Sequence, residues 1–222
     1  RPGDTDNIGG ANPSNPSFWR LARMSGLAPL VGVVGGYCFA GNAVLLGVCD
    51  VIIATRDPSI GMGGPVMIEC GGLGKVAPQD VGPMSALSPN GVVDIVVQDE
   101  AAAVAAAMKY LSYFQGPIAH WEAVDQLALR HAIPENRLRS YDVRTVIETL
   151  CDRDSVLELR REFGLGVVTA FARLEGRAIG IVASNPRHQA GAIDADDADK
   201  CAHFLQLCDA FDIPVLSLVD TP

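Results

Sequence analysis

The chain has 222 residues, of which 49% are hydrophobic and 19% are charged. This length fits one large domain or two small ones, and the composition is typical of a well-packed globular protein. The formal net charge of -9 argues against the basic surface of a nucleic-acid-binding protein. No apolar run approaches the roughly 20 residues that a membrane span needs, and the polar opening RPGDTDNIGG does not resemble a signal peptide. We expect a cytoplasmic protein that binds neither nucleic acid nor membrane.

The cysteines and histidines show no metal-binding pattern. Most of the six cysteines lie in apolar runs and none belongs to a C-x-x-C pair, so we expect reduced thiols in the core of a cytoplasmic protein. The four histidines lack ligand spacing. We therefore expect no metal in this segment.

The first half of the chain alternates short apolar runs with turns. Residues 29–36 and 50–55 are rich in Val and Ile and predict strands, and residues 41–49 between them predict a short buried helix. Residues 56–65 predict a loop, and a Pro-Asn-Gly turn leads into a strand within 88–97. The pattern indicates strands that alternate with helices.

A strong helix and a polar segment close this half. Asp99 and Glu100 begin the helical stretch AAAVAAAMKYLSYF, which ends at Gly116 and Pro117. The polar residues that follow predict a linker. The predicted division is one domain over 1–117, a linker over 118–141 and a second domain over 142–222.

The last third starts again with a helix over 142–151 and a β-hairpin over 167–184. The acidic residues 194–200 open another helix, and residues 213–220 predict a strand. Strand, helix and strand with short connections predict an α/β fold with parallel pairing. Functional loops of α/β folds follow the strands, so a chain that ends directly after one is expected to be a piece of a longer protein.

The glycine-rich stretch GGYCFAGNAVLLGVC allows two interpretations. Ala40, Gly41 and Asn42 lie at the N-terminus of the predicted helix, where backbone N–H groups lack helical partners and the helix dipole favours negative charge. Two such amides can stabilise the enolate oxygen of a thioester, and glycine lets a substrate approach the backbone. Alternatively, the glycines only allow tight packing between strand and helix.

Other motifs favour structural interpretations. The segment GGLGK over 71–75 partly resembles a phosphate-binding loop. Its residue spacing does not match that motif, so a flexible loop is favoured. The run DADDADK could hold a metal, but carboxylates in a first helical turn are usually caps. The aromatic residues on the helix end before Gly116 are expected in the core or an interface. Four arginines could meet a phosphate, although a solvated surface is favoured for each: Arg1, Arg20, Arg23 and Arg56.

Several stretches in family order resemble one enzyme family. GGYCFAGNAVLLGVCDVIIAT, IGMGGPVMIE, SPNGVVDIVVQDE and LSYFQGP resemble the N-domain of the carboxyltransferase (beta) component of biotin-dependent acyl-CoA carboxylases. EGRAIGIVASNPRHQAGAID and CDAFDIPVLSLVDTP resemble the first half of the C-domain. The resemblance covers nearly the whole chain and lies nearer the propionyl-CoA, acetyl-CoA and long-chain acyl-CoA carboxylases, including single-chain ones, than the bacterial acetyl-CoA type with its zinc ribbon.

The resemblance implies parts of two tandem crotonase-like ββα-superhelix domains. In this family the N-domain binds acyl-CoA, the C-domain of a partner subunit binds carboxybiotin, and the site lies at their interface, usually within a hexamer. Carboxybiotin releases CO2, the biotin nitrogen takes the α-proton, and the enolate attacks CO2. The implied partners are acyl-CoA, the biotin carboxyl carrier and biotin carboxylase domains or subunits, and further copies of the chain.

The family's N-domain amide pair matches Gly41 and Asn42, although the second position is often glycine elsewhere. That departure changes the shape of the pocket more than its chemistry, because asparagine keeps its backbone N–H. A glycine-rich loop before Arg1 and the second amide pair would lie outside this chain, so we expect no turnover by these 222 residues alone. The expected substrate-binding residues are Ala40, Gly36, Gly63, Gly64, Asn185 and Gly191.

Three functions fit the residues. The first is carboxyl transfer from carboxybiotin to the α-carbon of an acyl-CoA. The second is decarboxylation by a sodium-pump subunit of the same fold. The third is a non-catalytic scaffold, against which the amide pair at Gly41 argues.

Overall fold

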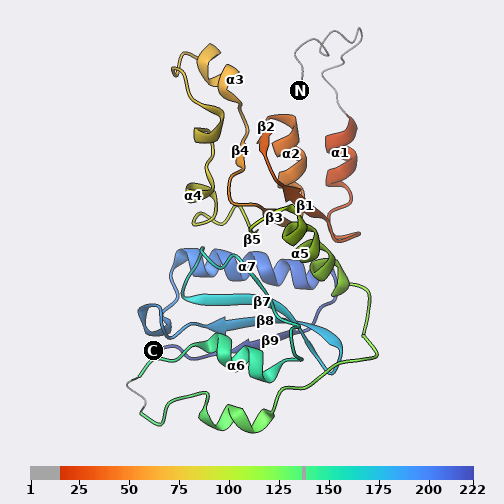
Figure 1. Ribbon diagram of the computed structural model, residues 1–222, viewed down its shortest axis with the longest axis vertical. Coiled ribbons are helices and arrows are strands. Elements are labelled where there is room, and N and C mark those ends of the chain that lie inside the picture. The colour runs from red at the N-terminus through yellow and green to blue at the C-terminus, as the bar shows by residue number, and fades with distance from the viewer. Residues whose placement is uncertain (1–15, 137–138) are drawn as a thin grey trace.

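The computed structural model describes residues 16–136 and 139–222 and places the strands in an upper and a lower group (Figure 1). In the upper group β1 (Val31–Val34), β3 (Val51–Ala54) and β5 (Ile95–Val96) form a parallel sheet in the order β1-β3-β5. The central strand β3 is buried along its whole length because helices cover both of its faces.

A second, smaller sheet in the upper group pairs β2 (Tyr37–Phe39) with β4 (Ser59–Gly61) in parallel. Helix α2 (Gly41–Gly47) directly follows β2 and packs Ala43 and Leu46 into a core with Ile52 and Ala54 of β3. The other elements of the upper group are α1 (Pro16–Ala22), α3 (Pro65–Cys70), a 3₁₀ turn (Pro78–Asp80) and α4 (Met84–Leu87).

The lower group is a four-stranded sheet in the order β6-β7-β8-β9. Strands β7 and β8 form the predicted hairpin, which turns between Leu174 and Arg177, and β8 pairs with β9 in parallel. Alternate residues of β7 face α7 on one side and α6 on the other, so almost the whole strand is buried. The bounds are β6 (Leu157–Leu159), β7 (Val167–Leu174), β8 (Arg177–Ser184), β9 (Val215–Leu218), α6 (Val143–Leu150) and α7 (Ala195–Ala210), with 3₁₀ turns at Gln126–His131 and Gln189–Gly191.

Helix α5 (Glu100–Ser112) lies between the two groups, beside α7 (Figure 1). Asp99 caps it by accepting a hydrogen bond from the Ala102 N–H at 2.8 Å, as its sequence indicates. Its buried Tyr110 packs edge-on against Phe171 of β7, with ring centroids 5.9 Å apart. One hydrophobic cluster therefore contains residues from both sides of the predicted domain border: Val51, Ile53, Ala103, Tyr110, Tyr113, Leu159, Phe171, Phe204, Leu207 and Cys208.

Most predicted elements are present, with shorter bounds, but the predicted loop over 56–65 contains β4 and leads directly into α3. Tyr110 and Tyr113 are core residues, as predicted. The acidic run is a capping box, in which the Asp194 side chain accepts the Asp197 N–H and the Asp197 side chain accepts the Asp194 N–H. The six cysteines are unpaired. Over the ranges that the structure describes, no helix is long and apolar enough to cross a bilayer.

Candidate active site

The glycine-rich turn lies where two parallel strands end side by side. Strands β2 and β4 are in register from Tyr37 opposite Ser59 to Phe39 opposite Gly61. Beyond them, the Ala40 N–H donates to the Gly61 carbonyl oxygen at 3.0 Å. The segments that follow both strands therefore emerge at one edge of this small sheet, the edge at which α/β folds bind ligands.

Ala40 holds an unusual backbone conformation at this edge. Its φ of 51° and ψ of -123° are costly for a residue that carries a Cβ. The conformation reverses the chain within one residue, and α2 begins at the next residue, where the Val44 N–H donates to the Ala40 carbonyl at 3.1 Å. The sharp turn aims the first amides of α2 away from the helix body.

Those first amides belong to Gly41 and Asn42, the predicted pair. Among the described residues neither N–H has a hydrogen-bond acceptor, because the first donors of an α-helix have no partner within it. Asn42 is exposed and Gly41 is half-buried beneath α1. A Cβ at Gly41 would lie 3.1 Å from Cζ of Phe18, so glycine suits the close approach of α1. The structure thus supports both interpretations of the glycines, packing and free amides.

Gly63 and Gly64 are brought to the same edge. They follow β4, and Gly64 is the N-cap of α3. A Cβ at Gly64 would lie 3.5 Å from the ring of Phe39, the last residue of β2. Gly36 is exposed in the turn before β2, at the opposite end of that strand from Ala40. The structure therefore groups Ala40, Gly41, Asn42, Gly63 and Gly64 but leaves Gly36 apart from them.

Asn185 and Gly191 lie in the lower group, in the loop from β8 to α7, well apart from α2 (Figure 1). The buried Asn185 side chain donates to the Leu165 carbonyl at 2.7 Å, and its backbone N–H donates to the Gly166 carbonyl at 2.7 Å. Gly191 has a φ of 83°, and a Cβ there would collide with the Asp220 carbonyl oxygen. Both residues shape the loop that follows β8.

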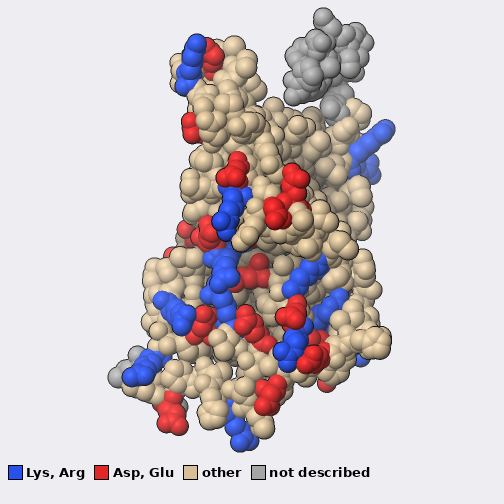
Figure 2. Space-filling view, in the orientation of Figure 1, with Lys and Arg blue, Asp and Glu red and all other residues tan. Residues whose placement is uncertain are grey.

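Charged side chains are fewer over the upper group than over the lower one (Figure 2). In Figure 2 Lys, Arg, Asp and Glu are densest over the lower group and its border with the upper one. Burial raises the pKa of the Cys38 thiol on β2, so that side chain is neutral at physiological pH. Backbone N–H groups at a helix N-terminus without intrahelical partners favour a bound oxygen that carries negative charge.

The outlying motifs take no part in this arrangement. Arg20 and Arg23 are exposed on or near α1, where the Arg23 guanidinium lies 4.8 Å from the centre of the Trp19 ring, and Arg1 lies outside the described residues. The sequence interpretation missed Phe18, which covers Gly41, because its contact with α2 is tertiary. It also missed Gly61, whose carbonyl fixes Ala40. The apolar Ile60 before Gly61 was the available signal for a strand.

The fold and the site define a class, the crotonase-like carboxyl transferases. The carboxyl transferase domain family matches residues 13–222, so the chain belongs to that family and the predicted fold class is confirmed. A solved single-chain, multi-domain long-chain acyl-CoA carboxylase is 55% identical with a TM-score of 0.95, covering 100% of this chain and 22% of that one.

Two curated relatives show the range of the family. The methylmalonyl-CoA carboxyltransferase 12S subunit of Propionibacterium freudenreichii is 32% identical over 92% of this chain and 41% of its own length. The methylmalonyl-CoA decarboxylase subunit alpha of Propionigenium modestum is 29% identical over 92% of this chain and 42% of its own length. The chain thus spans about two fifths of the curated relatives that it matches.

Proposed function

We propose that the protein containing this chain transfers a carboxyl group from carboxybiotin to the α-carbon of an acyl-CoA. The amide N–H groups of Gly41 and Asn42 carry this proposal, because within residues 16–136 and 139–222 they have no acceptor and they lie at a sharp strand-to-helix turn. Removal of an α-proton places negative charge on the thioester oxygen, and donors already aimed at that oxygen stabilise it. No side-chain nucleophile is required.

The residues of the upper group fit a thioester. Gly41, Gly63 and Gly64 present backbone without side chains at this edge, and the side chains of Phe18, Met67 and Phe39 border them. Their role is to bind the acyl group and fix its carbonyl oxygen. When bound, carboxybiotin supplies the carboxyl group as CO2. We assign the biotin side of the site to the loops after β8 and β9, which include Asn185 and Gly191.

We also propose how the parts assemble. Residues 1–117 form part of the N-domain, 118–141 the linker and 142–222 part of the C-domain. Because the amide pair and the loop after β8 lie apart in one chain, a complete site would join the N-domain of one copy to the C-domain of another. The solved 12S relative, at a TM-score of 0.79, is described as a hexamer assembly. We infer the same kind of oligomer here, served by biotin carboxyl carrier and biotin carboxylase domains or subunits.

The test uses the full-length protein and measures carboxyl transfer from methylmalonyl-CoA or malonyl-CoA to free biotin. Gly41→Pro removes one amide N–H, and loss of one such donor lowers kcat by on the order of 100 to 1000-fold. Gly41→Ala keeps the N–H but adds a methyl group toward Phe18. Gly47→Ala is the matched control, because nothing lies within 4 Å of a Cβ at that exposed end of α2.

Loss of transfer in a folded Gly41→Pro protein, with Gly47→Ala unaffected, supports the proposal. Equal activity of Gly41→Pro and wild type would contradict the role of the amide. A wild-type protein that neither transfers carboxyl groups nor binds any CoA ester would instead indicate a scaffold.

Decarboxylation of an acyl-CoA is the second candidate. It is favoured by the similarity to the decarboxylase subunit of Propionigenium modestum. The same amide pair would hold the enolate in either direction, so the partner proteins discriminate: a biotin carboxylase domain indicates carboxylation, and a membrane-bound decarboxylase subunit indicates the reverse.

A further inference from the structure

The parallel strands β8 and β9 end side by side in the lower group, and a loop follows each of them. Residues 185–194 connect β8 to α7, and residues 219–222 follow β9. The Asp220 N–H donates to Oγ of Ser184, the last residue of β8, at 3.2 Å, and Gly191 of the first loop lies so close to Asp220 that a Cβ there would collide with the Asp220 carbonyl oxygen. In α/β folds ligands bind outside the carboxyl ends of such strands.

Two consecutive residues at the start of α6 hold both loops. The Tyr141 hydroxyl donates to Oδ2 of Asp220 at 2.9 Å, which fixes the loop after β9. A guanidinium nitrogen of Arg187 donates to Oδ2 of Asp142 at 2.9 Å, which fixes the loop after β8. These contacts join residues 79 and 45 positions apart in the chain.

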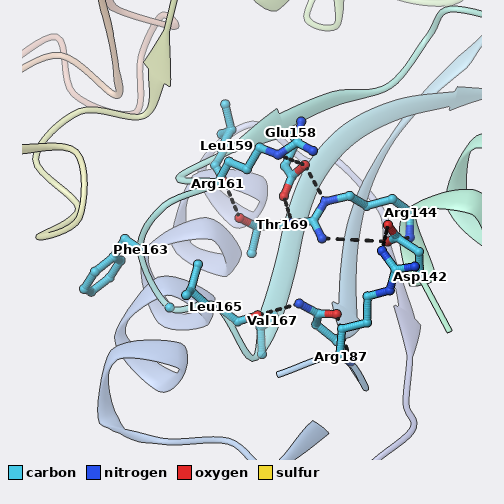
Figure 3. Close-up of polar contacts among 12 residues, drawn as sticks. Asp142, Arg144, Glu158, Leu159, Arg161, Phe163, Leu165, Val167, Thr169 and Arg187 are labelled. Atoms are coloured by element: carbon cyan, nitrogen blue, oxygen red, sulfur yellow. Dashed lines mark hydrogen bonds and ion pairs between the residues drawn. The ribbon is translucent and has the colours of Figure 1, made fainter. Parts of the chain in front are cut away.

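Asp142 is itself held firmly. Its Oδ1 accepts the Arg144 N–H at 3.1 Å and so caps α6, and the Arg144 side chain forms a two-pronged ion pair with Glu158 of β6 (Figure 3). Figure 3 shows Arg187 reaching from its loop to this anchored carboxylate. The anchor therefore transmits the rigidity of α6 and β6 to the loop after β8.

The held loops line a cavity of about 570 Å³. Pro186 and Ala190 of the first loop, Val219 and Asp220 of the second, and Tyr141 between them belong to its wall. Burial and the adjacent Asp220 raise the pKa of Tyr141 to about 12, so its hydroxyl keeps its proton and donates throughout the physiological range. A small ring with apolar edges and a polar group would match this mixed wall.

We propose that Tyr141 and Asp142 are positioning residues that hold the loops after β8 and β9 in the arrangement that receives the biotin ring. This inference rests on the proposed function. Each residue acts through the loop that it holds: Tyr141 through the loop after β9 and Asp142 through the loop after β8. Loss of either contact loosens one wall of the cavity and leaves the acyl-CoA side in the upper group unchanged.

The test uses the full-length protein with Tyr141→Phe and Asp142→Asn. Tyr113→Phe is the matched control, because the buried Tyr113 hydroxyl also makes a long-range hydrogen bond, to the Ser155 carbonyl, but far from both loops along the chain. We expect each test variant to raise the KM for free biotin roughly tenfold, the factor that loss of one charge-assisted hydrogen bond gives. The KM for methylmalonyl-CoA should not change. Tyr113→Phe should lower the melting temperature and change neither KM.

Amide hydrogen exchange gives a readout that does not depend on turnover. Tyr141→Phe should speed exchange mainly in residues 217–222, and Asp142→Asn mainly in residues 185–191. Equal changes in both KM values, or unchanged exchange in both loops, would overturn the proposal. If the wild-type protein transfers no carboxyl group, the proposed function and the biotin role both fail, while exchange still decides whether these residues hold the loops.

Discussion

The ion pair between Asp94 and Arg160 joins the upper and lower groups of the fold and offers a direct test of their coupling. Nε of Arg160 lies 2.8 Å from Oδ1 of Asp94, and the two side chains are only 16% and 3% exposed. The other carboxylate oxygen accepts the Ile52 N–H of β3 at 2.8 Å. The Arg160 N–H also donates to the Asp94 carbonyl at 2.8 Å, so side chain and backbone act together. The perturbation is Arg160→Met, which keeps an unbranched stem like that of arginine and removes the guanidinium with its charge.

The expected loss follows from burial. Removing one partner of a buried pair costs about 3 to 5 kcal/mol, because the remaining charge is left without compensation. Asp94 would still accept the Ile52 N–H, and Arg160 is not fully buried. We therefore expect Arg160→Met to lower the free energy of unfolding by about 3 kcal/mol. Asp94→Asn should cost less, because it leaves no uncompensated charge on the carboxyl side and retains an acceptor for Ile52.

The assay is urea-induced unfolding of the full-length protein, followed by hydrogen exchange of β3 and α7 to assign the transition to this part of the chain. Lys75→Met is the control, because the pair of Lys75 with Glu69 spans 3.4 Å between side chains that are 87% and 53% exposed. Such surface pairs contribute at most about 1 kcal/mol. If Arg160→Met destabilises the protein no more than Lys75→Met does, the reasoning about this buried pair is wrong.

Two further predictions concern the site and its support. Asn42→Gly keeps the backbone N–H and should leave kcat for carboxyl transfer within about threefold of wild type, whereas a 100-fold loss would show that the asparagine side chain takes part. Burial, helped by the nearby Arg160, lowers the pKa of His203 to about 4, so the folded protein holds this imidazole neutral. The unfolded chain gains its proton near pH 6.5, so this contribution to stability is present above pH 6.5 and is lost as the pH falls toward 4, and solvent screening of the partly exposed imidazole reduces its size. Urea midpoints at pH 7.5 and pH 5 should therefore differ less for His203→Gln than for wild type, and equal differences would contradict this.

The sequence predicted the order of elements well where one residue pattern decides the structure. The hairpin over 167–184 and the helix that begins after Asp194 have strong local signals: β-branched runs, a Glu-Gly turn and a capping box. Strand β4 was missed because three residues between a Pro turn and two glycines carry too little pattern. Its pairing with β2 supplies the hydrogen bonds that stabilise it.

Of the candidate site, the sequence predicted only the backbone amides at one strand-to-helix turn. Gly41 and Asn42 stand at a helix start, which the sequence indicates, but the strained φ of Ala40 depends on β4, a segment about 20 residues away along the chain. Tyr141 and Asp220 meet only because α6 packs beneath the parallel strands β8 and β9. No local pattern encodes a contact across 79 residues.

The hydrophobic cluster around Tyr110 and Phe171 has a consequence for synthesis on the ribosome. Helix α5 is translated well before α7, which carries Phe204, the residue that packs on Phe171. At about 5 to 20 residues per second, the apolar face of α5 waits several seconds or more for its covering strands and helix. During that interval the nascent chain exposes the apolar face of α5. Chaperone binding should therefore be strongest on ribosomes whose nascent chain includes α5 but does not yet include α7.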